Sequence, residues 1–385
     1  MRVSPFIIFF SIVLTVYGLI NYYIFRHAIQ AFPSPSKYTG LFTTLFVVLV
    51  VSYPAGRILE RVWQSWFSDV ITWVGAFWLA AMLYFFLIVL VVDIISLVGW
   101  MIPSLPAFLI HPSAELKAIY LYSSIGFIGL VLILGHINAI NPRIRTIDLQ
   151  TGKKAVGMKE VRMVMASDIH LGTIIGPRRV GKLVETINGL KPDIVLFAGD
   201  VVDEDLKPVI RQNLGEKLRQ ISAPLGVYAI MGNHEYIGGA EAASKYLTEH
   251  GITMLRDKVV NIKGMFYLAG REDRSSNSFA GRKRLTLDSL LSGLDRSRPI
   301  VLMDHQPFKL EEAEKQNVTL QLSGHTHNGQ LWPLNYIIDA IYEIGMGYKK
   351  IGNTHFYVSP GYGTWGPPVR TGHRPEIALI RLKFE

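Results

Sequence analysis

Five short clusters of Asp, Asn and His occur in the second half of the sequence, and each follows a short apolar run. In chain order they are Ser167-Asp168-Ile169-His170, Gly199-Asp200-Val201-Val202-Asp203, Gly232-Asn233-His234-Glu235, Asp304-His305 and Gly324-His325-Thr326-His327. Carboxylate and amide oxygens and imidazole nitrogens suit Mn, Fe, Zn or Co, and the sequence has no cysteine to offer softer sulfur. Seven such ligands exceed the needs of one tetrahedral ion, so the pattern favours two divalent ions that share a bridging carboxylate.

The elements around these clusters alternate between short apolar runs and helical patterns. Strands are predicted before the clusters at residues 161–166, 193–198, 226–230, 299–303 and 319–322, and further strands at 266–269, 355–359 and 377–382. Helices are predicted at 178–190, 208–220 and 240–250. This alternation predicts a sheet-centred α/β fold. Because ligands bind at the carboxyl ends of strands in open α/β sheets, the five clusters are expected to converge on one crevice.

Each cluster alone has an ordinary structural explanation. An isolated Asp-x-His is usually structural, Gly-Asn-His-Glu also fits a turn and helix start, and Gly-His-Thr-His also fits a surface loop. If the first and last clusters are extended, Asp168 and His170 face one side, as do His325 and His327. All five clusters at strand ends favour one shared site.

The order of the clusters resembles the signature of the calcineurin-like metallophosphoesterase superfamily, from Val161 to the C-terminus. Segments 167–172, 324–330 and 359–370 are most similar to a membrane-anchored bacterial branch that includes phosphodiesterases and UDP-2,3-diacylglucosamine pyrophosphatases. Asn328 departs from that branch, which usually has Gly there, and the loop is expected to survive because Asn tolerates left-handed backbone. The resemblance implies an α/β fold, a four-layer β-sandwich of two mixed sheets flanked by helices.

The same resemblance implies how the seven candidate ligands are shared between two metal ions. One ion would be held by Asp168, His170 and His327, the other by Asn233, His305 and His325, with Asp200 as the bridge. Such a pair of cations clamps the attacking and leaving oxygens of a phosphoryl transfer and makes hydroxide available near neutral pH. Mn is the expected metal, with Fe, Zn or Co as alternatives.

Three further residues are assigned roles by the resemblance. His234, expected to point away from Asn233 on an extended segment, would stabilise the phosphoryl charge or protonate the leaving oxygen. Asp203 would orient His234 through its other ring nitrogen, and a helix N-cap is the alternative. Arg370 would bind the substrate phosphate, and a structural salt bridge is the alternative.

The first part of the chain has a different composition. The first 140 residues hold six Lys or Arg and four Asp or Glu, whereas the remainder holds 33 and 26. This change predicts a transmembrane helical domain at residues 1–141 and the phosphoesterase domain at 142–385. Four stretches, 6–25, 38–53, 70–101 and 119–140, are long enough to span a bilayer.

Polar and proline-rich segments are expected to separate these spans: Arg26, the Pro33/Pro35 turn, the Arg57/Arg61 cluster and the Pro103/Pro106/Pro112 stretch. A signal peptide is the alternative for the first stretch, but the stretch is longer than a typical signal peptide and no small-residue cleavage site follows it.

Asp93 lies inside the third stretch. We expect its carboxylate near the head groups or against a neighbouring helix, and a functional intramembrane carboxylate is the alternative.

Flanking basic residues predict the orientation of the spans. Segments assigned to the inside hold Arg2, Arg57, Arg61, Arg143, Arg145, Lys153 and Lys154, and those assigned to the outside hold Arg26, Lys37 and Lys117. This bias predicts an integral protein of the cell inner membrane with its catalytic domain in the cytoplasm.

The sequence therefore predicts a membrane-anchored phosphoesterase that uses a metal-bridging hydroxide on a phosphodiester, pyrophosphate or phosphomonoester. The substrate would be a phosphorylated small molecule or lipid. The apolar segment at residues 331–347 would rest on the membrane or line a lipid groove, with core packing as the alternative. A receptor or scaffold with an inactive domain is disfavoured because every expected ligand is present. A nuclease is disfavoured because no basic stretch is interleaved with aromatic residues.

Overall fold

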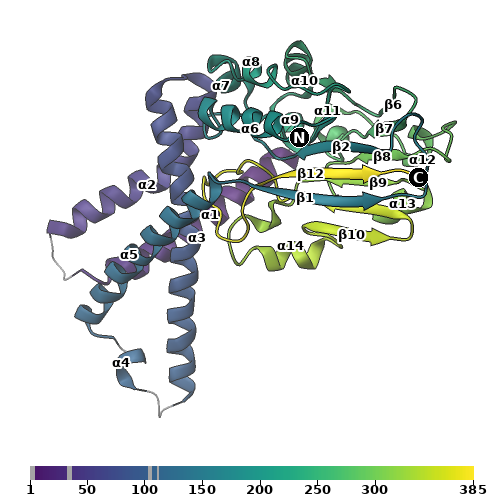
Figure 1. The fold of residues 1–385 in the computed structure, drawn as a ribbon. Helices are drawn as coiled ribbons and strands as arrows, with labels where there is room; N and C mark the ends of the chain where they lie inside the picture. The colour runs from purple at the N-terminus through teal and green to yellow at the C-terminus, as the bar shows by residue number, and fades with distance from the viewer. Residues whose placement is uncertain (1–4, 33–36, 103–105, 111) are drawn as a thin grey trace. The chain divides into compact units, whose positions relative to one another are not determined.

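The computed structural model describes residues 5–32, 37–102, 106–110 and 112–385 of the 385-residue chain. Contacts within the chain divide it into two units, Met1–Gly135 and His136–Glu385 (Figure 1). The predicted turn at Pro33 and Pro35 lies outside the described residues, and so do Pro103 and Arg2.

The first unit is helical. Its elements are α1 (Pro5–Ile29), α2 (Lys37–Val62), α3 (Trp66–Met101), α4 (Ala107–Ile110) and α5 (Ala114–Ala139), the last turn of which belongs to the second unit. Four helices, α1, α2, α3 and α5, are long and apolar enough to cross a membrane, in agreement with the four predicted spans. The Arg57/Arg61 cluster lies between the predicted spans 38–53 and 70–101, as expected, but α2 continues through it and ends only at Val62. Within α2, Arg57 forms an ion pair with Glu60 at 2.8 Å.

Helices α2 and α3 pack closely through glycine. A Cβ atom added at Gly75 would lie 2.4 Å from the Tyr53 Cα atom, and one added at Gly56 would lie 2.8 Å from the Thr72 Cα atom. Small residues at such contacts let helix backbones approach, which is how helices commonly associate in membranes. The core of this unit is formed by large side chains, among them Ile24, Phe46 and Trp78.

The second unit contains two six-stranded mixed sheets. The first sheet has the order β1 (Arg143–Gln150), β12 (Glu376–Lys383), β2 (Glu160–Ala166), β3 (Ile194–Ala198), β4 (Val227–Ile230) and β5 (Thr253–Met254). The second sheet has the order β10 (Gly347–Ile351), β11 (Thr354–Val358), β9 (Leu320–Ser323), β8 (Ile300–Met303), β7 (Phe266–Gly270) and β6 (Lys258–Ile262).

Helices cover the outer faces of the two sheets, so the second unit has four layers (Figure 1). The helices of this unit are α6 (Pro177–Gly189), α7 (Leu206–Arg211), α8 (Leu214–Leu218), α9 (Asn233–Gly238), α10 (Ala240–Glu249), α11 (Ser276–Ala280), α12 (Leu287–Leu290), α13 (Leu310–Lys315) and α14 (Asn335–Ile341). Met163, Leu196 and Leu322 belong to the core between the sheets. The predicted sandwich is confirmed.

Most predicted elements of this unit are present, with two kinds of difference. The helix predicted at 208–220 is split into α7 and α8, because Asn213 between them adopts a left-handed backbone with φ of 51°. The sequence prediction also missed the strands β1, β5, β6 and β10 and the short helices α9 and α11 to α14. Strand β1 lies at the edge of its sheet and pairs in parallel with β12, and its mixed polar sequence gives no continuous apolar signal.

Candidate metal centre

The five polar clusters follow strands β2, β3 and β4 of the first sheet and β8 and β9 of the second. Hydrogen bonds join the ends of these strands. The Asp168 amide donates to the Gly199 carbonyl at 3.0 Å, and the Gly324 amide donates to the His305 carbonyl at 2.9 Å. Across the two sheets, the His325 amide donates to the Asp168 carboxylate at 2.9 Å. The structure therefore brings the clusters to one place, as the sequence predicts.

The first group of candidate ligands consists of Asp168, His170 and His327, each of which offers one ligand atom within 4.8 Å of the others. His170 Nε2 and His327 Nε2 are 3.0 Å apart, and His327 Nε2 is 3.6 Å from Asp168 Oδ1. All three side chains are buried. Two imidazole nitrogens and one carboxylate that converge in this way form a suitable site for a divalent cation.

The second group consists of Asp200, His305 and His325, again within 4.8 Å of one another. Asp200 Oδ2 lies 3.1 Å from His305 Nε2 and 4.0 Å from His170 Nε2 in the first group. Asn233 joins the second group, since its Oδ1 atom is 2.9 Å from His325 Nδ1. Asp200 thus lies between the two groups, where a bridging carboxylate would have to be.

The donor atoms fit a divalent metal ion. The Asp168 Oδ2 atom is buried and accepts no hydrogen bond from any described residue, an arrangement that costs about 1–3 kcal/mol unless a cation or donor compensates it. Two glycines make room for the carboxylates: a Cβ at Gly232 would lie 2.1 Å from Asp200 Oδ1, and one at Gly324 would lie 2.3 Å from Asp168 Oδ2.

The pKa directions of Asp200, His325 and His327 agree with this interpretation. Burial alone would raise the pKa of Asp200, but the charges of His305 and His234 outweigh it and hold that pKa well below the ordinary value. Burial, followed by the charges of His170 and Arg370, lowers the pKa of His327 well below its ordinary value. Burial and the His305 charge also lower the pKa of His325. Burial would lower the pKa of His305, but the charge of Asp200 outweighs it and raises that pKa well above the ordinary value. A carboxylate at Asp200 and neutral imidazoles at His325 and His327 are protonation states that bind a metal, whereas a cation at His305 would have to displace a proton.

The backbone that positions the ligands is not extended, contrary to the expectation for Asp168/His170 and His325/His327. All four residues have left-handed φ angles, 51° and 53° for the first pair and 72° and 46° for the second. Left-handed backbone in residues other than glycine costs on the order of 1–3 kcal/mol each and is typical of functional sites. Asn328 also has a φ of 44°, so the loop accepts it in place of Gly as expected.

His234 points away from Asn233, but for a different reason than the extended segment that the sequence prediction assumed. Asn233 and His234 are the first residues of α9, where successive side chains are rotated by about 100°. The His234 amide donates to Asp200 Oδ1 at 2.9 Å, and His234 Nδ1 lies 3.2 Å from Asp203 Oδ1. The orienting role predicted for Asp203 requires this contact. The N-cap of the nearby helix α7 is Asp205 instead.

Nearby carboxylates raise the pKa of His234. Burial lowers it, but the charges of Asp200, Asp203 and Glu204 together raise it to about 9. The ring also lies 5.8 Å, centroid to centroid, from Trp365, an exposed residue that the sequence prediction did not single out. A protonated imidazole at this place can stabilise negative charge or donate a proton.

Arg370 is fully buried and lies next to the candidate ligand His327. Its guanidinium donates to the carbonyls of Pro360 and Gly363 at 2.7 and 2.8 Å and lies 3.2 Å from His327 Nδ1. Within the described residues it forms no ion pair with a carboxylate, so the salt-bridge alternative is not observed. Its predicted contact with the substrate phosphate stays a prediction.

Glu235 organises the site, although no role was predicted for it. Its buried carboxylate accepts hydrogen bonds from the amides of Gly232, Val202 and Asp200 at 2.7, 2.8 and 3.2 Å. It thereby ties the Asp200 loop to the start of α9. Glu at the third position of a helix is a capping-box signal, so the Gly-Asn-His-Glu motif contained the information needed to find it.

The apolar segment that follows the last two ligands is largely exposed. Residues 335–341 form α14, none of whose side chains is buried. Trp332 is 52% exposed, and Ile337 and Ile341 are each 55% exposed. Core packing, the alternative considered for this segment, is therefore wrong for α14. Next to the helix, the Tyr342 ring lies 6.3 Å from the His325 ring, so the apolar surface begins beside the metal centre.

Comparisons with known proteins agree with this site. The sequence model of the calcineurin-like phosphoesterase family matches residues 161–329. An uncharacterized metallophosphoesterase of Aquifex aeolicus is 32% identical over 64% of this chain and 94% of its own length. One of Campylobacter jejuni is 28% identical over 98% of this chain and 99% of its own length. A transmembrane protein with metallophosphoesterase domain of Danio rerio is 31% identical over 66% of this chain and 61% of its own length.

Proposed function

Because this chain belongs to the calcineurin-like metallophosphoesterases, we propose that it is a membrane-anchored enzyme that hydrolyses a phosphodiester, pyrophosphate or phosphomonoester. The observation that carries the proposal is the convergence of seven buried or half-buried ligands into two adjacent groups with Asp200 between them. Four apolar helices precede the catalytic unit, which supports a membrane location.

The positions of the side chains support the role proposed for each of them. Asp168, His170 and His327 would hold one divalent cation, and Asn233, His305 and His325 the other. When bound, such a pair of ions polarises the phosphoryl oxygens and lowers the pKa of a water molecule. Asp200 holds its negative charge between the two groups, and His234, oriented by Asp203, stabilises the phosphoryl charge or protonates the leaving oxygen.

Hydrolysis by the purified full-length chain tests this function. The panel comprises a phosphomonoester, a phosphodiester, a nucleotide diphosphate sugar and an acylated form of that sugar, each with Mn²⁺ added. We expect metal-dependent release of phosphate or of a phosphorylated product from at least one of them, abolished by a chelator and restored by the metal. A protein that binds two metals and hydrolyses none of the four would instead favour a receptor or scaffold that has lost catalysis.

The substrate in this proposal is an amphipathic lipid that carries a phosphodiester or pyrophosphate. Ile337, Ile341 and Trp332 form an exposed apolar surface on and beside α14, where acyl chains would lie close to the metal centre. Lys349 and Lys350 follow this surface in the sequence, and basic residues near an anionic leaflet contribute about 1 kcal/mol each. A general phosphatase that the helices merely tether is the competing possibility.

Changing both Ile337 and Ile341 to Ser is expected to remove the preference for an acylated substrate. Burying one such side chain against an acyl chain contributes about 1.5–3 kcal/mol, so kcat/KM for the acylated substrate should fall at least about tenfold. The deacylated counterpart should be hydrolysed at an unchanged rate. Ile210→Ser, at an equally exposed site on α7 (55%), is the control. Equal rates on both substrates, unaffected by the double substitution, would contradict the lipid proposal.

The catalytic unit is proposed to face the cytoplasm. Seven Lys or Arg residues flank the spans on the predicted inner side, against three on the predicted outer side, and such an excess favours the cytoplasmic side. Two reporters fused separately after Glu385 test this: a fluorescent protein that folds in the cytoplasm, and alkaline phosphatase, which is active only outside it. We expect the fluorescent fusion to fluoresce and the phosphatase fusion to be inactive. Activity of the phosphatase fusion alone would place the unit on the opposite side.

A further inference from the structure

The helical unit contains a cavity of about 500 Å³ between its helices, a volume within the range typical of ligand sites. Most of its lining is aliphatic or aromatic. The apolar walls include Phe42, Phe46, Phe85, Leu45, Leu49 and Ile88, contributed by α2 and α3. Such walls offer no hydrogen bonds to a polar ligand, and they match the chemistry of an acyl chain.

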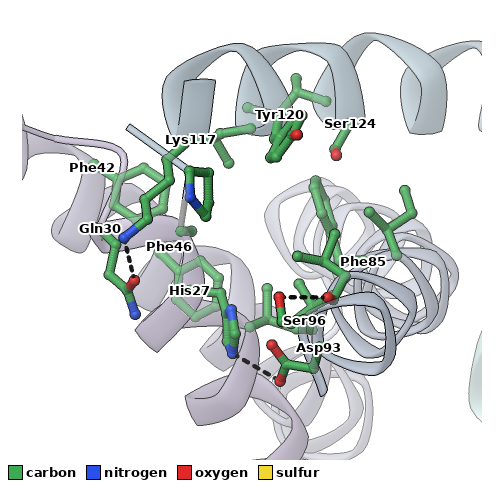
Figure 2. A pocket seen from close by; sticks show the side chains of 18 of the residues that line it. His27, Gln30, Phe42, Phe46, Phe85, Asp93, Ser96, Lys117, Tyr120 and Ser124 are labelled. Atoms are coloured by element: carbon green, nitrogen blue, oxygen red, sulfur yellow. Dashed lines mark hydrogen bonds and ion pairs between the residues drawn. The ribbon is translucent and has the colours of Figure 1, made fainter. Parts of the chain in front are cut away.

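Polar groups gather along part of this cavity (Figure 2). His27, near the end of α1, lies 3.3 Å from the carboxylate of Asp93, and Tyr23 donates a hydrogen bond to the same carboxylate. The predicted contact of Asp93 with a neighbouring helix is therefore present. Since His27 and Tyr23 both contact Asp93, its negative charge already has partners within the protein.

Lys117 also lines this cavity, and its positive charge, unlike the charge of Asp93, has no partner of opposite charge among the described residues. It lies in the first turn of α5, and its ammonium donates to Gln30 Oε1 at 3.1 Å (Figure 2). Gln30 is neutral, and Lys117 forms no ion pair with any carboxylate among the described residues. The lysine, at the start of one apolar helix, and Gln30, just past the end of another, are placed where a membrane meets water if these helices cross it.

The geometry points to a binding site for an anionic phospholipid in the helical unit, with one acyl chain in the cavity and the phosphate of its head group at Lys117. The apolar walls take the chain, the ammonium supplies the complementary charge, and Gln30 offers a second polar group to the head group. This site is separate from the metal centre, and lipid binding there does not require hydrolysis.

Native mass spectrometry of the full-length chain in mild detergent tests the proposal, with phosphatidylglycerol and phosphatidylcholine of identical acyl chains as probes. We expect one tightly bound lipid and a preference for phosphatidylglycerol of about fivefold, as expected for one basic residue at a lipid surface. Lys117→Ala should abolish the preference, whereas Lys37→Ala, which does not line the cavity, should retain it. Equal retention of both lipids by the wild type would overturn the assigned head group.

A second pair of variants tests the cavity. Leu45 lines it, whereas Leu41, one turn earlier on α2 and similarly exposed, does not. Leu45→Trp should fill the space and reduce retained lipid at least tenfold, and Leu41→Trp should leave it unchanged. If both variants retain lipid like the wild type, the lipid binds elsewhere and the proposal is wrong. Should Leu45→Trp fail to fold, shown by aggregation in gel filtration, the lysine pair still decides the outcome.

Discussion

Asp200→Asn is expected to reduce turnover by on the order of 10³-fold or more, because several kcal/mol of transition-state stabilisation depend on the paired cations. The substitution keeps the size of the side chain but removes the carboxylate charge of Asp200, which lies between the two candidate ligand groups, 3.1 Å from His305 and 4.0 Å from His170. The bound metal, measured by elemental analysis of the purified chain, should fall below two ions per molecule.

Asp205→Asn is the matched control for this experiment. Asp205 lies on the same loop but caps helix α7, where it accepts a hydrogen bond from the Lys207 amide. Asn is an equally good cap, so turnover and metal content should match the wild type. Full activity of Asp200→Asn with two ions retained would remove Asp200 from the bridging position.

His234→Ala is expected to lower kcat by about 10²–10⁴-fold, as is typical when a general acid or a charge-stabilising group is lost. Both ions should remain bound, because the side chain of His234 points away from Asn233 and contacts Asp203. Single-turnover rates and elemental analysis of the same preparation measure the two quantities together. A loss of metal in step with activity would make His234 a ligand.

A double-mutant cycle separates the role of Asp203 from that of His234. Asp203→Asn should cost about 10–100-fold, the usual effect of a residue that orients a functional group. If it acts only through the imidazole 3.2 Å away, it should have no further effect in the His234→Ala background. Additive losses would indicate that Asp203 also acts on the nearby His170, whose Nδ1 atom is 3.6 Å from it.

Local patterns of residue types were enough to predict a sheet-centred α/β class, the four apolar helices and the clusters that meet at one site, whereas the four-layer sandwich was predicted from the family resemblance. Apolar runs and their polar ends are local features, so β3 and the Asp200 cluster after it are visible without a structure. Strands β1, β5 and β6, each at an edge of its sheet, were missed, because such strands have little apolar signal and form through pairing with neighbours.

Tertiary structure alone decided how the clusters are oriented and what surrounds them. The backbone of Asp168 and His170 is left-handed, a conformation that depends on contacts between loops distant in sequence, such as the bond from the His325 amide to Asp168. The exposure of Ile337 and Ile341 depends on what packs against α14, which composition does not determine.

The sequence by itself determined which candidate ligands are present and their order along the chain, because the chemistry of a side chain depends on residue type. Only the folded chain decided their distances, the partners of Glu235 and the cavity beside Lys117, because these arise from residues brought together by packing.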